Sequence, residues 1–153
     1  MKPELILMDT FYVVGFPAII KDNYAQIREL WDLLREAKAA VKNETGACIG
    51  LEFYPFDFTS TKQFYYMPCY VVTDLSDIPA TMCGKVVEGG KYAVWKHKGT
   101  VATLHETFHK IYHEYLPASG FRFRQPYDFE WYDEKFLGPD NPESELQIRI
   151  PVM

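Results

Sequence analysis

The chain has 153 residues, a formal net charge of −5 and a hydrophobic fraction of 48%, which suits one domain with a packed core. The acidic balance and the scattered Lys and Arg residues exclude the basic patch of a nucleic-acid-binding surface, so no direct nucleic-acid partner is expected. There is no apolar signal segment, no run of membrane-spanning length and no CxxC pair, so we expect a cytoplasmic protein with free thiols, no cofactor and no membrane partner.

The first half of the sequence predicts a strand, a helix and two further strands. Apolar residues at helical spacing follow a capping Asp22 or Asn23, which indicates an amphipathic helix. Turn residues at 55–60 separate two segments rich in β-branched and aromatic residues. The expected elements are a strand at 4–14 ended by Gly15 and Pro17, a helix closed by Asn43 and Gly46, and strands at 47–54 and 63–73.

The second half repeats this pattern after a link at 74–90. Thr100 is the expected N-cap of a second amphipathic helix, and Pro117 and Gly120 are expected to end it. The expected elements are a strand at 91–97, a helix at 101–115 and strands at 127–134 and 144–151.

The two halves match in sequence as well as in element order. A shift of about 78 positions relates Asp22 to Thr100, and it places Leu51-Glu52-Phe53-Tyr54 over Phe129-Glu130-Trp131-Tyr132. We interpret this match as an internal duplication, with coincidence between two aromatic strands as the alternative.

The duplication predicts an α+β fold class. We expect one domain over 1–153, built from two pseudo-symmetric strand–helix–strand–strand modules in halves of about 1–78 and 79–153. Two such modules can join their antiparallel sheets and leave a central ligand cleft, which is where small molecules usually bind.

Glu130 is the main candidate for chemistry. Side chains alternate between the two faces of a strand, so Glu130 shares a face with Asp128 and Tyr132. Phe129 and Trp131 share the other face, and because helices need apolar partners we expect those two rings to lie under a helix.

The duplication adds Glu52 and Tyr54 to the same expected cleft. A carboxylate among rings is costly to bury unless it is paired, and a ligand cation would gain both charge attraction and contact with ring faces. The alternative is that Glu130 lies on a solvated face or pairs with Arg149 or Lys96.

Other aromatic residues are candidates for the wall of the pocket, with core packing as the alternative role for each ring. Tyr12 and Tyr92 hold similar places in the first strand of each half, and parity does not choose between Tyr65 and Tyr66. The candidate ligand-binding residues are Tyr12, Glu52, Tyr54, Tyr66, Pro68, Tyr92, Trp95, Glu130 and Tyr132.

The segment from His105 to His109 fits HExxH, the pattern of a zinc-protease helix. The helical wheel argues against a catalytic metal, because His109 and His113 turn away from the apolar stripe and no third ligand follows. We therefore expect no metal. No GxSxG elbow is present, so a serine nucleophile has little support.

Four segments together resemble the GyrI-like family, which includes the effector-binding domains of AraC-type and multidrug-sensing transcription regulators. The signature is spread over 91–152. Its segments are Tyr92 to Gly99, Ile111 to Phe121, Asp128 to Tyr132 and Pro142 to Val152.

The resemblance implies two strand–helix–strand–strand modules, and it implies that Glu130 is the family's buried acid. It also implies hydrophobic, often cationic ligands. The chain starts at the first strand, so we expect a stand-alone member without the regulators' helix-turn-helix.

Two other functions stay open. Some stand-alone relatives hydrolyse strained cyclopropane rings of DNA-alkylating natural products, and Glu130 could activate water here with Tyr92 or Tyr132 as its partner. The third hypothesis is a protein-interaction regulator, with a protein partner or a homodimer.

Overall fold

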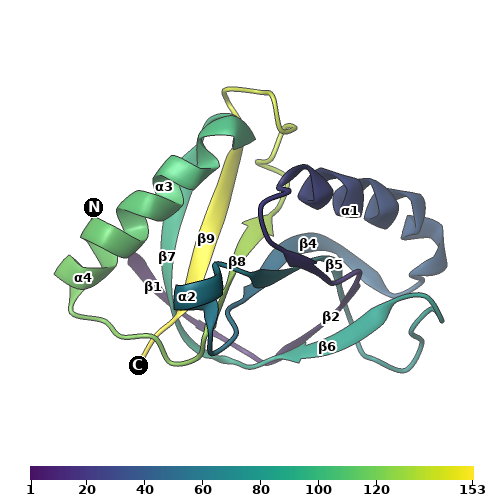
Figure 1. Cartoon of the computed structure of the whole chain (residues 1–153). Helices are drawn as coiled ribbons and strands as arrows, with labels where there is room; N and C mark the ends of the chain where they lie inside the picture. The colour runs from purple at the N-terminus through teal and green to yellow at the C-terminus, as the bar shows by residue number, and fades with distance from the viewer. The chain divides into compact units, whose positions relative to one another are not determined.

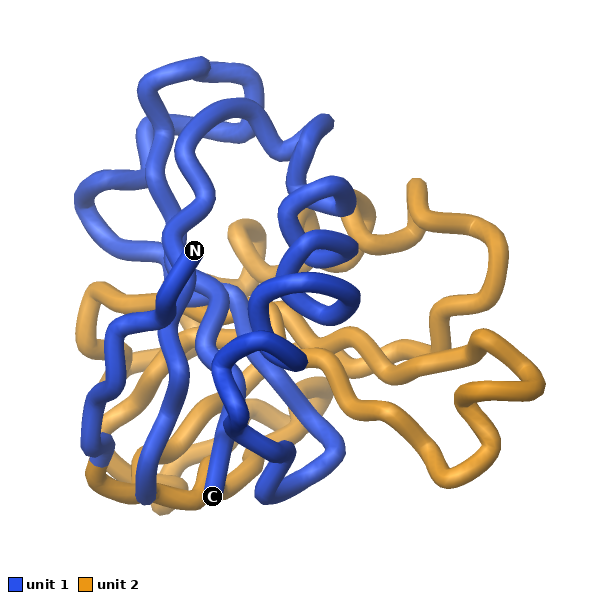
Figure 2. Tube along the Cα trace, turned by 90° about the vertical axis from the view of Figure 1, so that its left-hand side faces the viewer, with its two compact units in different colours: residues 1–8, 90–153 blue, residues 9–89 orange.

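The computed structural model describes all 153 residues and forms two compact units (Figure 2). Unit 1 consists of Met1–Met8 and Gly90–Met153, and unit 2 consists of Asp9–Gly89. The expected halves, 1–78 and 79–153, are contiguous, whereas unit 1 is assembled from two separated segments. No helix combines the length and the apolar character needed to cross a membrane.

Unit 1 is an antiparallel sheet with one long helical segment. Its strands are β1 (Glu4–Met8), β7 (Gly90–Lys98), β8 (Tyr127–Tyr132) and β9 (Glu145–Pro151), in the order β1-β7-β9-β8. We call residues 101–119 the helical rod, because one helical stretch follows another without a break (Figure 1). It consists of a 3-10 turn (Val101–Thr103), α3 (Leu104–Lys110), a π-helical turn (Ile111–Tyr115) and α4 (Leu116–Ser119).

Unit 2 has the same plan. Its helix α1 (Ala25–Glu36) is followed by a 3-10 turn (Lys38–Ala40), and a single helical turn, α2 (Phe58–Thr61), precedes β5. Its strands are β2 (Phe11–Gly15), β3 (Ala18–Ile20), β4 (Glu44–Phe53), β5 (Phe64–Val72) and β6 (Cys83–Val87), in the order β6-β2-β5-β4, with β3 beside β5.

The equal strand order confirms the α+β fold class and the pseudo-symmetry. β1, β7, β9 and β8 of unit 1 correspond to β6, β2 with β3, β5 and β4 of unit 2. In unit 2 the second of these strands is interrupted between β2 and β3, where Pro17 has no N–H to donate to a neighbouring strand. In each unit the edge strand is the one that precedes the other unit's module in the sequence. β1 directly precedes β2 but pairs with β7, and β6 directly precedes β7 but pairs with β2.

Two strand predictions were wrong. The expected strand at 4–14 is two strands, because Asp9 and Thr10 interrupt it and its two parts pair with different neighbours. The link at 74–90 contains β6, which sequence patterns missed because one glycine and one lysine dilute its short apolar run. The loop at 55–60 includes the start of α2.

The helix ends also differ from the predictions. Neither Asp22 nor Asn23 caps α1, since Tyr24 holds that position. Thr100 does hold the N-cap position at the start of the rod, as expected, but it makes no side-chain capping bond. Pro117 does not stop the second helix, because it lies in the first turn of α4, directly after the wider π-helical turn. The rod ends instead at Gly120, whose φ of 78° favours glycine.

Each sheet buries one face against its helix. In unit 2, Leu34 of α1 packs with Val14, Tyr70 and Val72 of the sheet, and Leu30 packs with a second group that includes Ile20 and Phe64. In unit 1 the fully buried residues of the sheet and the rod include Trp95, Ile111, Leu146, Ile148 and Ile150.

Candidate functional site

Glu130 and Tyr132 form a buried pair on β8. Only 4% of Glu130 is exposed, and the Tyr132 hydroxyl donates a hydrogen bond of 2.9 Å to its Oε1. Residues two apart in a strand share a face, so the alternation of the strand brings the hydroxyl to the carboxylate. The expectation that Glu130 is held away from bulk water together with Tyr132 is therefore confirmed.

Unit 2 carries the same kind of pair at the end of β4, with Glu52 in the strand and Tyr54 directly after it. The Tyr54 hydroxyl donates to Glu52 Oε2, also at 2.9 Å. Both residues of this pair are partly exposed, in contrast to the buried pair of unit 1. The duplicated sequence thus produces the same local contact twice.

The helical rod lies over the face that carries Glu130. Ile148 is opposite Glu130 and also opposite Trp95, so all three side chains share one face of the sheet. Trp95 and Ile111 of the rod line a common hollow. The expectation that Phe129 and Trp131 lie under the helix was wrong, because helix packing selected the opposite parity.

Asp128 shares the face of Glu130, as expected, and it is fully buried. Its Oδ2 accepts a hydrogen bond from the Tyr112 hydroxyl, which extends from the π-helical turn. This contact links the rod to β8. No motif in the sequence indicated this contact between Tyr112 and Asp128.

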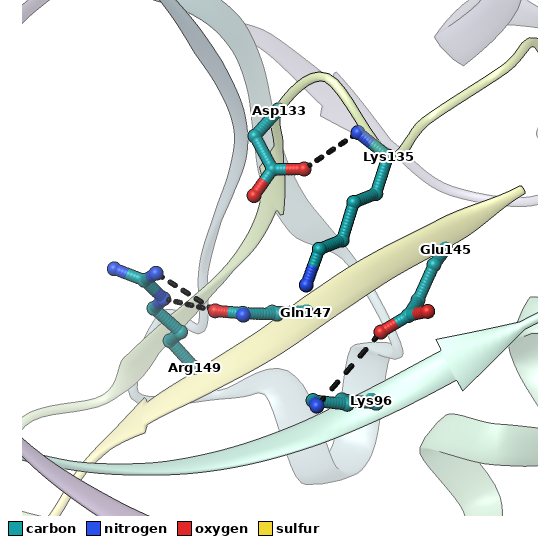
Figure 3. Close-up of polar contacts among 6 residues, drawn as sticks. All are labelled: Lys96, Asp133, Lys135, Glu145, Gln147 and Arg149. Atoms are coloured by element: carbon teal, nitrogen blue, oxygen red, sulfur yellow. Dashed lines mark hydrogen bonds and ion pairs between the residues drawn. The ribbon is translucent and has the colours of Figure 1, made fainter.

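Lys96 and Arg149 lie on the far face of the unit 1 sheet, opposite to the face of Glu130 (Figure 3). The Arg149 guanidinium lies 4.3 Å from the centre of the Trp131 ring. It also donates to Gln147 Oε1, as the dashed lines in Figure 3 show. Burial lowers the pKa of Arg149, while Asp133 and Glu4 oppose this shift.

Lys96 forms an ion pair of 3.9 Å with Glu145, which is also visible in Figure 3. Neither Lys96 nor Arg149 pairs with Glu130. The alternative in which Glu130 lies on a solvated face or is neutralised by one of them was therefore wrong.

Tyr92 is not brought to Glu130. Its hydroxyl lies 2.6 Å from the Tyr127 hydroxyl, and its ring makes an edge contact with Phe129 on the far face. Burial and the bond to Tyr127 raise the pKa of Tyr92. Tyr12, by contrast, packs beside Val14 and Leu34 on the helix face of unit 2, so the two tyrosines do not hold equivalent positions.

Of Tyr65 and Tyr66, only Tyr66 lies on the helix face of unit 2. Tyr66 is 2% exposed and lies opposite Glu52, whereas Tyr65 is 43% exposed on the other face. The Tyr66 hydroxyl accepts a hydrogen bond of 3.0 Å from the Trp31 indole of α1. Pro68 is buried on the same face.

A ring cluster accompanies Glu52. The Tyr54 ring lies 4.9 Å from that of Phe58 and 6.2 Å from that of Phe64, between ring centres. Phe58 was not among the sequence candidates because it falls inside the turn predicted at 55–60. A helical turn at this point brings its ring onto Tyr54.

A hollow of about 190 Å³ lies beside the rod in unit 1. It has two lysines and no carboxylate in its lining, so it does not match a site for a cation. The Trp95 indole donates to the carbonyl of Met1 at its edge. The lining residues are Met1, Trp95, Lys96, Thr107, Lys110, Ile111 and Tyr115.

Comparison with known proteins identifies a family and a curated relative. The family Cass2, described as integron-associated effector binding protein, matches residues 4–152. The transcriptional regulator BrlR of Pseudomonas aeruginosa is 29% identical over 154 residues, covering 99% of this chain and 56% of that protein. The chain thus spans about half the length of the curated relative it matches.

Two solved structures illustrate the shared fold. SAV2435 bound to tetraphenylphosphonium has a TM-score of 0.78 at 19% identity, over 100% of this chain and 94% of that one. A hydrolase encoded by lin2189 from Listeria innocua has a TM-score of 0.54 at 14% identity, over 99% of this chain and 92% of that one.

Two like α+β units, each with a Tyr–Glu pair on its helix face, define an effector-binding domain of the GyrI-like kind. The chain belongs to the Cass2 family of effector binding proteins. The resemblance to ligand-binding effector domains is therefore confirmed.

Proposed function

We propose that this chain is one ligand-binding domain over 1–153 that takes up an apolar, positively charged small molecule, with Glu130 as the residue that recognises the charge. The observation that carries the proposal is the Glu130–Tyr132 pair, a carboxylate with 4% exposure oriented by a phenol hydroxyl. A protein gains little stability from burying an acid in this way, so the pair is better explained by a ligand.

The attraction between the Glu130 carboxylate and a positively charged ligand is large enough to favour cations over other apolar ligands. Two unit charges about 4 Å apart gain on the order of 4 kcal/mol at an effective dielectric constant of about 20. The edges of aromatic rings are unfavourable to cations but their faces attract them, so the tyrosines of the two pairs add selectivity. SAV2435, which shares the fold, was solved with tetraphenylphosphonium, an apolar cation of this class.

Glu52 and Tyr54 are proposed as a second set of ligand contacts in unit 2. Their hydrogen bond repeats the geometry of the Glu130 pair, and the rings of Phe58 and Phe64 surround Tyr54. Tyr12, Tyr66, Pro68 and Trp95 are proposed as the packing that holds these strands in place. The three thiols are free, which favours the reducing cytoplasm as the place of action.

The test compares two probes of nearly equal shape and opposite charge. Tetraphenylphosphonium should raise the melting temperature of the wild type and bind in calorimetry, whereas tetraphenylborate should not. Glu130→Gln should weaken cation binding by roughly tenfold or more, since one lost charge contact is worth at least about 1.4 kcal/mol. Glu134→Gln, at an exposed site two residues beyond Tyr132, is the matched control.

Equal affinity of the wild type and Glu130→Gln for the cation would remove Glu130 from this role. Preference for the borate would overturn the charge argument. Mass spectrometry of a cyclopropane-containing electrophile incubated with and without the protein separates binding from hydrolysis, because an enzyme would add water to it faster than buffer alone.

A further inference from the structure

Three of the chain's four histidines lie on the helical rod of unit 1. His105, His109 and His113 follow one another at intervals of four residues, and all three are exposed. The fourth, His97, is buried, with Nδ1 2.7 Å from Thr107 Oγ1 and Nε2 2.9 Å from the Thr100 carbonyl. Only the three rod histidines therefore have ring nitrogens open to solution.

His109 and His113 already lie together. Their ring centres are 4.2 Å apart, and the ring planes differ by 33°. His105 is one turn earlier and makes no ring contact. The difference follows from the backbone, because His109 belongs to α3 and His113 to the π-helical turn.

The π turn explains the close approach. Residues four apart in an α-helix are neighbours but are offset around the axis. A π turn has more residues per turn, so each residue turns through a smaller angle, and the position four residues later comes closer to lying directly above. The step from His109 to His113 crosses this junction, whereas the step from His105 to His109 does not.

We propose that His109 and His113 form a two-imidazole binding site for a divalent transition-metal ion of the Ni²⁺ or Cu²⁺ class. Imidazole is a preferred ligand of these ions, and two ligands from one helix face leave the remaining positions to water. No group of three or more His, Cys, Asp or Glu side chains surrounds the pair, so the site is open rather than a closed structural centre. It differs from the HExxH pattern, whose ligands would be His105 and His109.

An ion bound by His109 and His113 would stabilise the π-helical turn. The two histidines flank Tyr112, whose hydroxyl donates to Asp128 on β8. A bridge between His109 and His113 would hold this turn in its folded form, because the ion binds two ligands that the unfolded chain does not keep together. Metal binding should therefore raise the melting temperature as well as release heat.

The experiment uses the full chain without an affinity tag, in a Cys83→Ser background, because Cys83 is exposed and a thiol would compete for the ion. NiCl₂ is titrated by calorimetry in a non-coordinating buffer, and CuCl₂ is followed by electron paramagnetic resonance. We expect one Ni²⁺ per chain and the signature of two imidazole nitrogens on Cu²⁺.

His109→Gln and His113→Gln should each weaken Ni²⁺ binding by roughly tenfold or more and abolish the melting-temperature increase. His105→Gln is the matched control and should leave both unchanged. Equal loss in His105→Gln and His113→Gln, or no loss in any of the three, would overturn the site. Circular dichroism of each variant shows whether the helix content is retained, so a folding defect is separated from a lost ligand.

Discussion

The two Tyr–Glu pairs offer a comparison of one contact in two environments. The bond lengths are equal, but the Glu130 pair is buried and the Glu52 pair is partly exposed. A hydrogen bond matters most where water cannot replace it. The same substitution should therefore have different effects in the two units.

We expect Tyr132→Phe to lower the free energy of unfolding by about 1–3 kcal/mol, because a buried carboxylate loses a donor. Tyr54→Phe should cost less, since water can replace the hydroxyl at Glu52. Urea denaturation of both variants at neutral pH measures the two effects. Equal losses would mean that burial does not set the strength of this contact.

Because the Cys48 thiol is buried, we expect the free energy of unfolding to fall at alkaline pH. Burial raises the pKa of its thiol from 9.0 to about 11, while nearby Lys38 lowers it and Glu44 raises it further. Above pH 9.0 the unfolded chain loses this proton and the folded chain keeps it. The stabilisation is therefore complete below pH 9.0 and is lost as the pH rises through about 11.

Cys48→Ala should flatten this decline by up to about 1.4 kcal/mol per pH unit inside that window. Urea midpoints measured between pH 8.0 and 11 test it, and Cys83→Ala, at an exposed thiol, is the control. Because Cys69 and Tyr70 also have raised pKa values, part of the decline should remain. Parallel curves for the wild type and Cys48→Ala would contradict the assignment.

At the scale of single residues, the sequence predicted which side chains share a face of a strand better than it predicted which of the two faces the helix covers. Alternation along β8 grouped Asp128, Glu130 and Tyr132 on one face, and their hydrogen bonds lie there. It could not say which face the helix covers, because both faces of β8 carry rings. On the far face the Arg149 side chain covers the Trp131 ring, so an aromatic residue there can be covered without a helix.

At the scale of elements, the interiors of helices and strands were predictable and their ends were not. The apolar stripe of the second helix is correct, but Pro117 was expected to end it and instead continues it after the π turn. A proline is tolerated in a helix at a position where the backbone N–H would have no carbonyl acceptor within the helix. That condition depends on the preceding turn, which the pattern of apolar residues does not report.

Gly15 tests the pairing of β2 with β5. A Cβ at this position would lie 2.0 Å from the Pro68 carbonyl oxygen, which belongs to the backbone of the neighbouring strand. We expect Gly15→Ala to lower the free energy of unfolding by about 1–3 kcal/mol or more, because the strands must separate to admit the methyl group.

Gly84→Ala on β6 is the control for that substitution. Its Cβ would meet the end of the Ile78 side chain at 2.5 Å, and a flexible side chain can move away. Thermal or urea denaturation should rank the variants, with Gly15→Ala the less stable. The reverse order would show that the backbone contact at Pro68 is relieved without cost.

At the scale of the whole chain, the duplication was visible in the sequence but the origin of the edge strands was not. A shift of about 78 positions finds the repeated Glu–aromatic–Tyr motif and both helices. It does not show that β1 belongs with β7 and β6 with β2, because strand pairing depends on contacts distant in the sequence. A contiguous division at residue 78 therefore separates β6 from its partner β2.

This arrangement predicts which fragment of the chain retains more structure. Residues 9–89 keep every strand pairing of unit 2, namely β2 with β5 and β6, and β3 and β4 with β5. Residues 1–78 lack β6 and carry β1 without β7, which leaves one edge of β2 and all of β1 unpaired. Unpaired edges with exposed apolar residues such as Leu7 promote aggregation.

We therefore expect the 9–89 fragment to be more soluble and to show more amide protection in hydrogen exchange than the 1–78 fragment, although it is only slightly longer. Adding residues 79–89 to the second fragment separates the two causes, because the 1–89 fragment regains β6 but still carries unpaired β1. Its protection should match that of 9–89 while its solubility stays lower. If 1–78 were as protected as 9–89, the pairing of β6 with β2 would contribute little to unit 2, and the contiguous half would be the true folding unit.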